Sequence, residues 1–143
     1  MSTAVGSANS ILNLIYRAVA WADVSQDDGS GPATTLEVAL HTAAPATDLQ
    51  SSNEVTVGAW NTYARVSVNR STAKWLAAAL GVTKNVELLQ FVEMASGTGC
   101  TITHVSVGIS GNVIHYGTLA SPRAVSAGIQ PQFAAQALVS SIT

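Results

Sequence analysis

Beyond Thr34 the sequence is a series of short apolar runs, in several of which apolar and polar residues alternate, and turn-forming residues separate the runs. A period of two is typical of half-buried β-strands, and the spacing leaves no room for the helices that connect parallel strands. We therefore predict a mainly β fold, an antiparallel β-sandwich of jelly-roll type with about eight strands. The expected strands cover residues 35–41, 53–57, 63–69, 86–92, 102–109, 113–119, 123–126, 129–133 and 137–142.

The clearest turn is Ser110-Gly111-Asn112, because glycine and asparagine tolerate positive φ. It predicts a β-hairpin between the runs on either side, with Ser121-Pro122 ending the second strand. Residues 73–80 depart from the strand pattern, since their Ala and Leu content favours one or two helical turns that Gly81 would stop. An Ala-rich loop is the alternative for this segment.

The segment before Thr34 has a helical rather than a strand-like pattern. Its apolar residues recur at spacings of three and four, at Ile11, Leu14, Ile15, Ala18 and Trp21. We therefore divide the chain into an N-terminal arm and helix with a following loop, residues 1–33, and a β-sandwich domain, residues 34–143. The pattern leaves open whether the helix packs on its own domain or docks on a neighbouring subunit.

The surface of this protein must be weakly charged. Charged residues make up only 10% of the chain, and six Lys and Arg against eight Asp and Glu give a net charge of −2. Because no basic field is available to hold phosphates, nucleic acid is not an expected partner. The sequence shows neither an apolar run of about 18 residues nor a signal-peptide pattern, so neither a membrane partner nor secretion is expected.

Few residues are suited to carry chemistry. The one cysteine, Cys100, is interpreted as a small half-buried hydrophobe. The histidines, His41, His104 and His115, lack carboxylates at ligand spacing, and we interpret them as hydrogen-bonded structural residues rather than a zinc site. No Gly-x-Ser-x-Gly turn is present to hold a nucleophilic serine. We predict no enzymatic activity, no cofactor and no metal.

Five short motifs follow one another in the β-rich part of the chain. They are Val38-Ala39-Leu40-His41-Thr42-Ala43 with Pro45, Asn53-Glu54-Val55, Tyr63-Ala64-Arg65, Thr103-His104 with Gly108-Ile109, and Tyr116-Gly117 with Leu119. In this order, after the helical segment, they resemble a family of small virion proteins of tailed bacteriophages, and the likeness runs from about Ile11 to Val139. Two features depart from the family pattern. Residues 75–80 are rich in Ala and Leu where a more polar loop is usual, and Val107 replaces an aromatic residue.

Proteins of this kind are head decoration proteins or tail-associated structural proteins. The resemblance implies first a capsid decoration, or cement, protein on the capsid surface of a virion assembled in the host cytoplasm. Its partners would be the major capsid protein and copies of itself, as a homotrimer. The alternatives are a tail or appendage component, and a receptor- or glycan-binding β-sandwich in which Trp60 or Tyr63 would stack on a sugar.

A capsid-bound protein of this kind needs apolar contact residues. The expected ones are Ile11, Leu14, Ile15 and Trp21 on the N-terminal helix, with Trp60 and Trp75 on loops.

Overall fold

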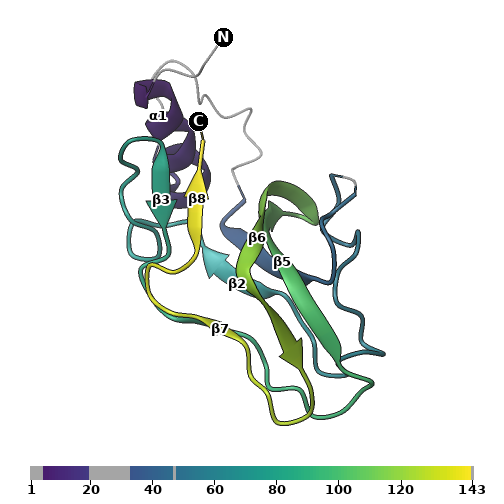
Figure 1. Ribbon diagram of the computed structural model, residues 1–143. Helices are drawn as coiled ribbons and strands as arrows, with labels where there is room; N and C mark the ends of the chain where they lie inside the picture. The colour runs from purple at the N-terminus through teal and green to yellow at the C-terminus, as the bar shows by residue number, and fades with distance from the viewer. Residues whose placement is uncertain (1–4, 20–32, 47, 143) are drawn as a thin grey trace. The chain divides into compact units, whose positions relative to one another are not determined.

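A computed structural model describes residues 5–19, 33–46 and 48–142 (Figure 1). The elements in this part of the chain are α1 (Val5–Arg17), β1 (Thr35–His41), β2 (Val66–Asn69), β3 (Val82–Lys84), β4 (Leu89–Gln90), β5 (Cys100–Ile109), β6 (Asn112–Val125), β7 (Gln132–Phe133) and β8 (Val139–Ser141). The predicted class is confirmed: the protein is mainly β, with one N-terminal helix and antiparallel sheets consistent with a β-sandwich. No helix within the described ranges is long and apolar enough to cross a membrane.

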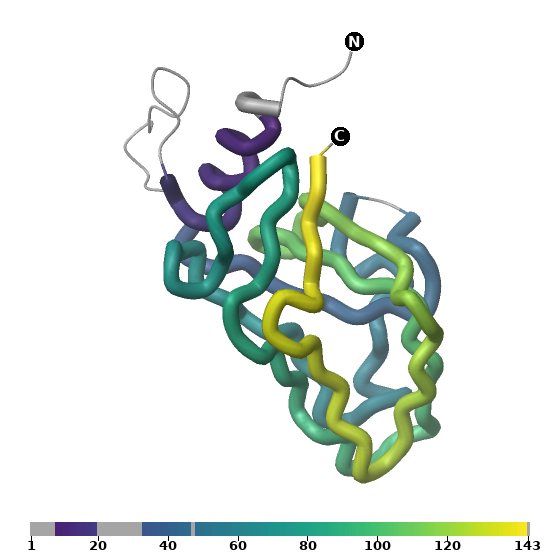
Figure 2. Tube along the Cα trace, turned by 60° about the vertical axis from the view of Figure 1, so that its left-hand side comes forward, coloured from purple at the N-terminus to yellow at the C-terminus, as the bar shows by residue number. Residues whose placement is uncertain are grey.

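Contacts within the chain divide it into two compact units. Unit 1 comprises Met1–Thr35, Asn69–Leu89 and Phe133–Thr143, and unit 2 comprises Leu36–Val68 and Gln90–Gln132. In unit 1 the helix α1, the strand β3 and the C-terminal strand β8 lie together, although they are far apart in the sequence (Figure 2).

The largest sheet has the strand order β2-β1-β5-β6. β1 and β5 are antiparallel, with Glu37 opposite Gly108 and His41 opposite His104. β5 and β6 form the predicted hairpin around Ser110 and Gly111. Both turn residues have positive φ, 50° and 80°, which is the conformation that a two-residue hairpin turn of type I′ requires.

β6 is longer than the sequence predicted, because it continues through Ser121-Pro122 to Val125. The register shifts along the hairpin, so residues 119–122 of β6 lie opposite Thr103 alone. Pro122 falls in this irregular part, where its missing N–H removes no ladder hydrogen bond. The proline therefore marks a bulge rather than the end of the strand.

Residues 73–80 form turns and an extended loop, so the helical prediction is wrong and the Ala-rich loop is confirmed. This loop pairs through isolated bridges of Trp75 with Asn85 and of Ala79 with Val82. The side chain of Trp75 is fully buried, and its packing overrides the helical preference of the neighbouring alanines. The strand β3 that follows was not predicted.

Other strands are shorter than expected. Of residues 86–92 only β4 is a strand, and residues 53–57 contribute a single bridge, from Glu54 to His41. Both segments still pack inward at alternate positions, since Val55, Leu89 and Phe91 are buried. Apolar alternation therefore indicated burial at these positions but not at Val57, which is 68% exposed, and it could not show whether a strand partner was present.

The turn that leads into β3 carries an unusual residue. Leu80 and Gly81 have φ of 53° and 73°, and the leucine side chain is 83% exposed. Asparagine is favoured in this conformation, whereas a bulky side chain is strained in it. We expect Leu80→Asn to raise the melting temperature by about 2–4 °C, equivalent to about 0.5–1 kcal/mol.

Differential scanning calorimetry measures this change. The matched control is Leu88→Asn, which replaces a leucine that is 49% exposed and does not have positive φ. The control should not raise the melting temperature. Equal shifts in the two variants would show that turn strain at Leu80 is not the cause.

Candidate interaction surface

The N-terminal helix is fastened at its C-terminal end. Arg70 donates from Nη2 to the Leu14 carbonyl (2.6 Å) and from Nε to the Ile15 carbonyl (2.5 Å). These carbonyls belong to the last turn of α1, where no further helical N–H is available to them. The positive charge of Arg70 also interacts favourably with the negative C-terminal end of the helix dipole. Arg70 thereby ties α1 to its own unit.

Two asparagines of α1 bind the loop before β3. The Oδ1 atom of Asn9 accepts the Gly81 N–H (2.5 Å), and that of Asn13 accepts the Ala78 N–H (3.0 Å). These bonds satisfy backbone donors in a segment that has few ladder partners. The helix thus substitutes for a strand along this loop.

The buried stripe of α1 also faces its own unit. Tyr16 is fully buried, its ring centroid lies 4.5 Å from that of Trp75, and its hydroxyl is hydrogen-bonded to Ser140. Leu12, one turn earlier, is buried as well. The question that the sequence left open is thereby answered for these residues, because the helix packs within its own unit.

The predicted contact residues fall into three groups. Ile11, Leu14 and Ile15 are half-buried on α1 and keep part of their surface available, whereas Trp21 lies outside the described residues. Trp60 and Trp75 are fully buried, in unit 2 and unit 1 respectively.

The two tryptophans do not serve as surface anchors. Trp60 packs against Tyr63 and Phe91, at ring-centroid distances of 5.4 and 6.4 Å. Its ring therefore offers no face on which a sugar could stack. Trp75 likewise has no exposed surface. We correct the prediction at these two positions and assign both tryptophans to the cores of their units.

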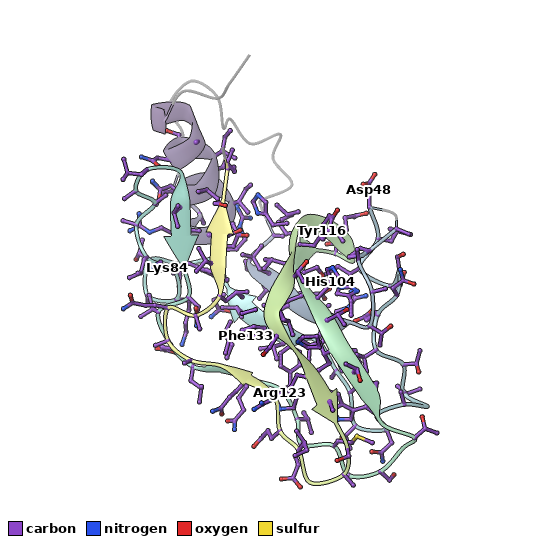
Figure 3. The ribbon with its side chains drawn as sticks, viewed as in Figure 1. Asp48, Lys84, His104, Tyr116, Arg123 and Phe133 are labelled. Carbon is purple, nitrogen blue, oxygen red and sulfur yellow. The ribbon has the colours of Figure 1, made fainter. Side chains whose placement is uncertain are left out.

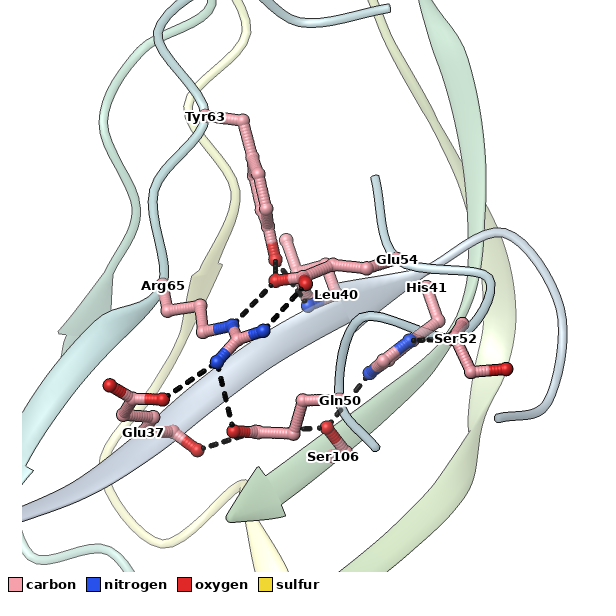
Figure 4. Close-up of polar contacts among 9 residues, drawn as sticks. All are labelled: Glu37, Leu40, His41, Gln50, Ser52, Glu54, Tyr63, Arg65 and Ser106. Atoms are coloured by element: carbon pink, nitrogen blue, oxygen red, sulfur yellow. Dashed lines mark hydrogen bonds and ion pairs between the residues drawn. The ribbon is translucent and has the colours of Figure 1, made fainter. Parts of the chain in front are cut away.

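A network of polar side chains lies against β1 in unit 2 (Figure 4). Arg65 is at its centre, with Nη1 2.8 Å from Glu37 Oε2, and with Nε and Nη2 each 2.8 Å from one oxygen of Glu54. The two-pronged bond to Glu54 is the strongest geometry available to an arginine and a carboxylate. It is the largest cause that raises the pKa of Arg65, so the guanidinium remains charged at every pH at which the protein folds.

Tyr63 joins this network to the backbone of β1. Its hydroxyl donates to Glu54 Oε1 (3.0 Å) and accepts the Leu40 N–H (2.9 Å). Burial raises the pKa of Tyr63, so the phenol stays neutral and keeps the proton that it donates. The Tyr63 hydroxyl thereby serves as the partner of the Leu40 N–H, a backbone donor of β1.

His41 continues the network toward β5. Its Nδ1 is 3.0 Å from the Ser52 carbonyl, which only accepts, so Nδ1 carries the proton and Nε2 accepts the Ser106 hydroxyl (2.8 Å). Gln50 Nε2 donates to Ser106 Oγ (3.2 Å) and to the Glu37 carbonyl (3.0 Å). His41 and Ser106 are both fully buried, so this serine–histidine pair is out of reach of a substrate.

The burial of His41 predicts a pH dependence of stability. Burial lowers the pKa of His41 below its ordinary 6.5, so the unfolded chain binds a proton that the folded chain excludes. The contribution is fully present above about pH 6.5 and is lost as pH falls toward the folded-state pKa. In this range the unfolding free energy should fall by up to about 1.4 kcal/mol per pH unit.

Urea denaturation at a series of pH values between about 5 and 7 measures this slope. The variant His41→Gln has no titrating group at position 41 and keeps the other histidines, so it should show a shallower slope than the wild type. Identical slopes in the two proteins would contradict the assignment to His41.

The motifs that carry the family resemblance meet in this network. Glu54 comes from the second motif, Tyr63 and Arg65 from the third, and His41 from the first. Together these residues hold the segment 42–65 on the sheet, so their role is structural. No group of three potential metal ligands occurs among the described residues.

Two of the remaining candidate reactive residues, His104 and Cys100, also have the structural surroundings that the sequence predicted. His104 is hydrogen-bonded to Thr103 and Thr118, as the sequence prediction of a hydrogen-bonded histidine requires. Cys100 is half-buried, as predicted, and burial raises the pKa of its thiol, which disfavours the nucleophilic thiolate.

Apolar side chains at the surface are the feature most suited to binding a partner. The large exposed ones are Val19, Leu49, Val57, Leu76, Leu80, Leu88, Val92, Tyr116, Ile129 and Val139. Figure 3 labels Tyr116, which is 58% exposed on β6. Sequence reasoning did not select these residues. Leu80 could have been noticed in the sequence, because Asn, Asp or Gly is usual directly before the glycine of such a turn and leucine is not.

Comparison with known proteins shows which class of protein this chain belongs to. No curated protein matches the chain. The family described as Podophage GP4 fiber I protein gp80 matches residues 1–141, which is nearly the whole chain. The match supports the virion class that the motifs implied and does not extend to head decoration. The chain therefore belongs to the Podophage GP4 fiber I protein gp80 family, a family of bacteriophage virion structural proteins.

Proposed function

We propose that this protein is a non-enzymatic structural subunit of a fiber-type appendage on a phage virion. The family match over residues 1–141 carries the proposal, because the family is described by a fiber protein. Of the alternatives drawn from the sequence, the appendage component is thus favoured over the capsid cement protein.

The chemistry of the described residues supports a structural role. The serine–histidine pair is fully buried, and the charged groups around Arg65 are bound to one another. The surface instead offers apolar side chains such as Leu80 and Val57, which are 83% and 68% exposed. With only 10% charged residues, such a surface suits lasting contact with other subunits.

Immuno-electron microscopy of intact virions tests the proposal. Gold-labelled Fab fragments raised against the purified chain should label fibers, and virions assembled without the chain should lack both the label and the labelled fiber. Label spread over the faces of the capsid would overturn the proposal and support the cement function. Tail-less heads provide the matched control, since a cement protein would label them as strongly as it labels whole virions.

A further inference from the structure

β3 and β8 form a short antiparallel ribbon in unit 1, which we call the C-terminal ribbon (Figure 1). Its register pairs are Val82 with Ser141, Thr83 with Ser140, and Lys84 with Val139. Thr83 and Ser140 are buried on the face that α1 covers, where Ser140 meets Tyr16. The opposite face is open, with Val139 53% exposed.

The edge of the ribbon on the β3 side is occupied by the preceding loop. The Leu76 N–H donates to the Lys84 carbonyl (2.9 Å), and the Val86 N–H donates to the Lys74 carbonyl (2.9 Å). The other edge is formed by β8. Among the residues that the structure describes, no second strand pairs with β8. The open edge of the C-terminal ribbon is therefore the edge of β8.

The hydrogen-bond pattern shows which backbone groups face this open edge. The bonds at the two ends of the ribbon run from the Ile142 N–H to the Gly81 carbonyl (2.9 Å) and from the Asn85 N–H to the Leu138 carbonyl (3.2 Å). Bonded and non-bonded pairs alternate in an antiparallel ladder, so Ser140 bonds within the ribbon. The N–H and C=O groups of Val139 and Ser141 consequently point away from β3.

This edge is short, since β8 has three residues, but it lacks the proline, charge and bulge that guard other exposed strands. β6, the outer strand of the largest sheet, contains Pro122, Arg123 and an irregular register. Residues 138–142 contain neither proline nor a charged residue, and the β3–β8 register is unbroken. An unguarded strand edge is a template for pairing with another strand.

Leu80 adds an exposed apolar group at the turn that leads into β3. Its strained φ of 53° and its 83% exposure mean that the leucine opposes local turn stability and adds little to the core. A residue that conflicts with its local structure and remains exposed is suited to contact with another molecule. Unit 1 thus has an open strand edge at β8 and an exposed leucine at the turn before β3.

We propose that β8 pairs antiparallel with β8 of a second copy of this chain, around a two-fold axis at Ser140. The outward groups of Val139 in each copy then bond to those of Ser141 in the other, and the two ribbons form one four-stranded sheet. Serine suits the axis, because the side chains of a non-bonded pair approach closely there. The proposal rests on the proposed fiber function, in which many copies of the chain meet.

The charge of the ribbon is compatible with a second copy as the occupant. Lys84 is the one charged residue in β3 and β8. In the four-stranded sheet, each Lys84 lies level with Val139 of its own copy. The two Val139 residues lie on opposite sides of the two-fold axis, so the two lysines are not level with each other. Like charges therefore do not face each other across the contact.

Sedimentation equilibrium of the full chain over a range of concentrations tests the proposal. The wild type should reach twice its chain mass of 14.6 kDa. Val139→Pro removes an outward N–H and leaves the bonds between β3 and β8 in place, so it should fold and associate at least tenfold more weakly. Far-ultraviolet circular dichroism and the melting temperature verify that the variant is folded.

The matched control is Val57→Pro, which replaces another exposed valine at the second position of a turn closed by the Ala59 N–H to Thr56 carbonyl bond. Proline is favoured at that position, so this variant should associate as the wild type does. Hydrogen exchange gives an independent readout, since the Ser141 amide should become protected as the concentration rises. A monomer at every concentration, a trimeric mass, or unchanged association of Val139→Pro would overturn the β8 contact. The virion labelling needs no such contact, so either proposal can fail without the other.

Discussion

Gly108→Ala is expected to destabilise the protein by about 3 kcal/mol, a large part of the stability of a domain of this size. A Cβ atom at this position would lie 2.3 Å from the Asn112 carbonyl oxygen and 2.4 Å from Gln50 Cδ. The first neighbour is backbone and cannot move aside without disturbing the β5–β6 hairpin. The second belongs to the polar network around Arg65. Gly108 is therefore required by a close approach of other atoms, since its own φ is not positive.

Gly117→Ala is the matched control, because Gly117 lies on the other strand of the same hairpin and its Cβ would meet nothing within 4 Å. This variant should change stability by less than about 0.5 kcal/mol. Urea denaturation followed by tryptophan fluorescence reports both values, since Trp60 and Trp75 are buried and become exposed on unfolding. Equal losses in the two variants would mean that the approach to Asn112 and Gln50 does not decide the outcome.

The elements that could be predicted from the sequence are those fixed by local chemistry. The β5–β6 hairpin follows from the turn at Ser110-Gly111. The apolar spacing predicted that a helix is present, but α1 ends at Arg17 and its fully buried face is Ala8, Leu12 and Tyr16, not the face of Ile11, Leu14 and Ile15. β3 could not be predicted, because its three residues become a strand only through pairing with β8, more than fifty residues away in the sequence. Pro122 misled the prediction for a related reason, since a bulge depends on the partner strand.

Prediction of the site was limited in the same way. Glu54, Tyr63 and Arg65 were recognised as parts of motifs, but the sequence does not show that they meet. The tryptophans were assigned to partner contacts because aromatic residues are common at interfaces, and the structure buries Trp60 and Trp75 instead. Composition alone does not distinguish a core aromatic residue from an interface one. The exposure of Val139 became visible only once β8 was placed.

Arg65→Met is expected to cost about 3 kcal/mol, near the lower end of the range for breaking a buried ion pair. Methionine keeps much of the volume but leaves Glu37 and Glu54 without their cation. The side chain of Glu54 is only 13% exposed, so water replaces little of the lost interaction. The side chain of Arg65 is itself 25% exposed, so we expect a loss of stability at the lower end of the range for buried ion pairs. Arg123→Met, which removes an exposed arginine, should change stability by less than about 0.5 kcal/mol.

A double-mutant cycle separates the ion pair from general packing. Glu54→Gln should be destabilising in the wild type, where it weakens the two-pronged bond to Arg65. In the Arg65→Met background the same change removes an uncompensated negative charge, so it should cost at least about 1 kcal/mol less. Chemical denaturation of the four proteins gives the coupling energy. A coupling near zero would mean that Arg65 stabilises the loop through its contacts with Gln50 and the aliphatic surroundings, and that the bond to Glu54 is not what holds residues 42–65 on the sheet.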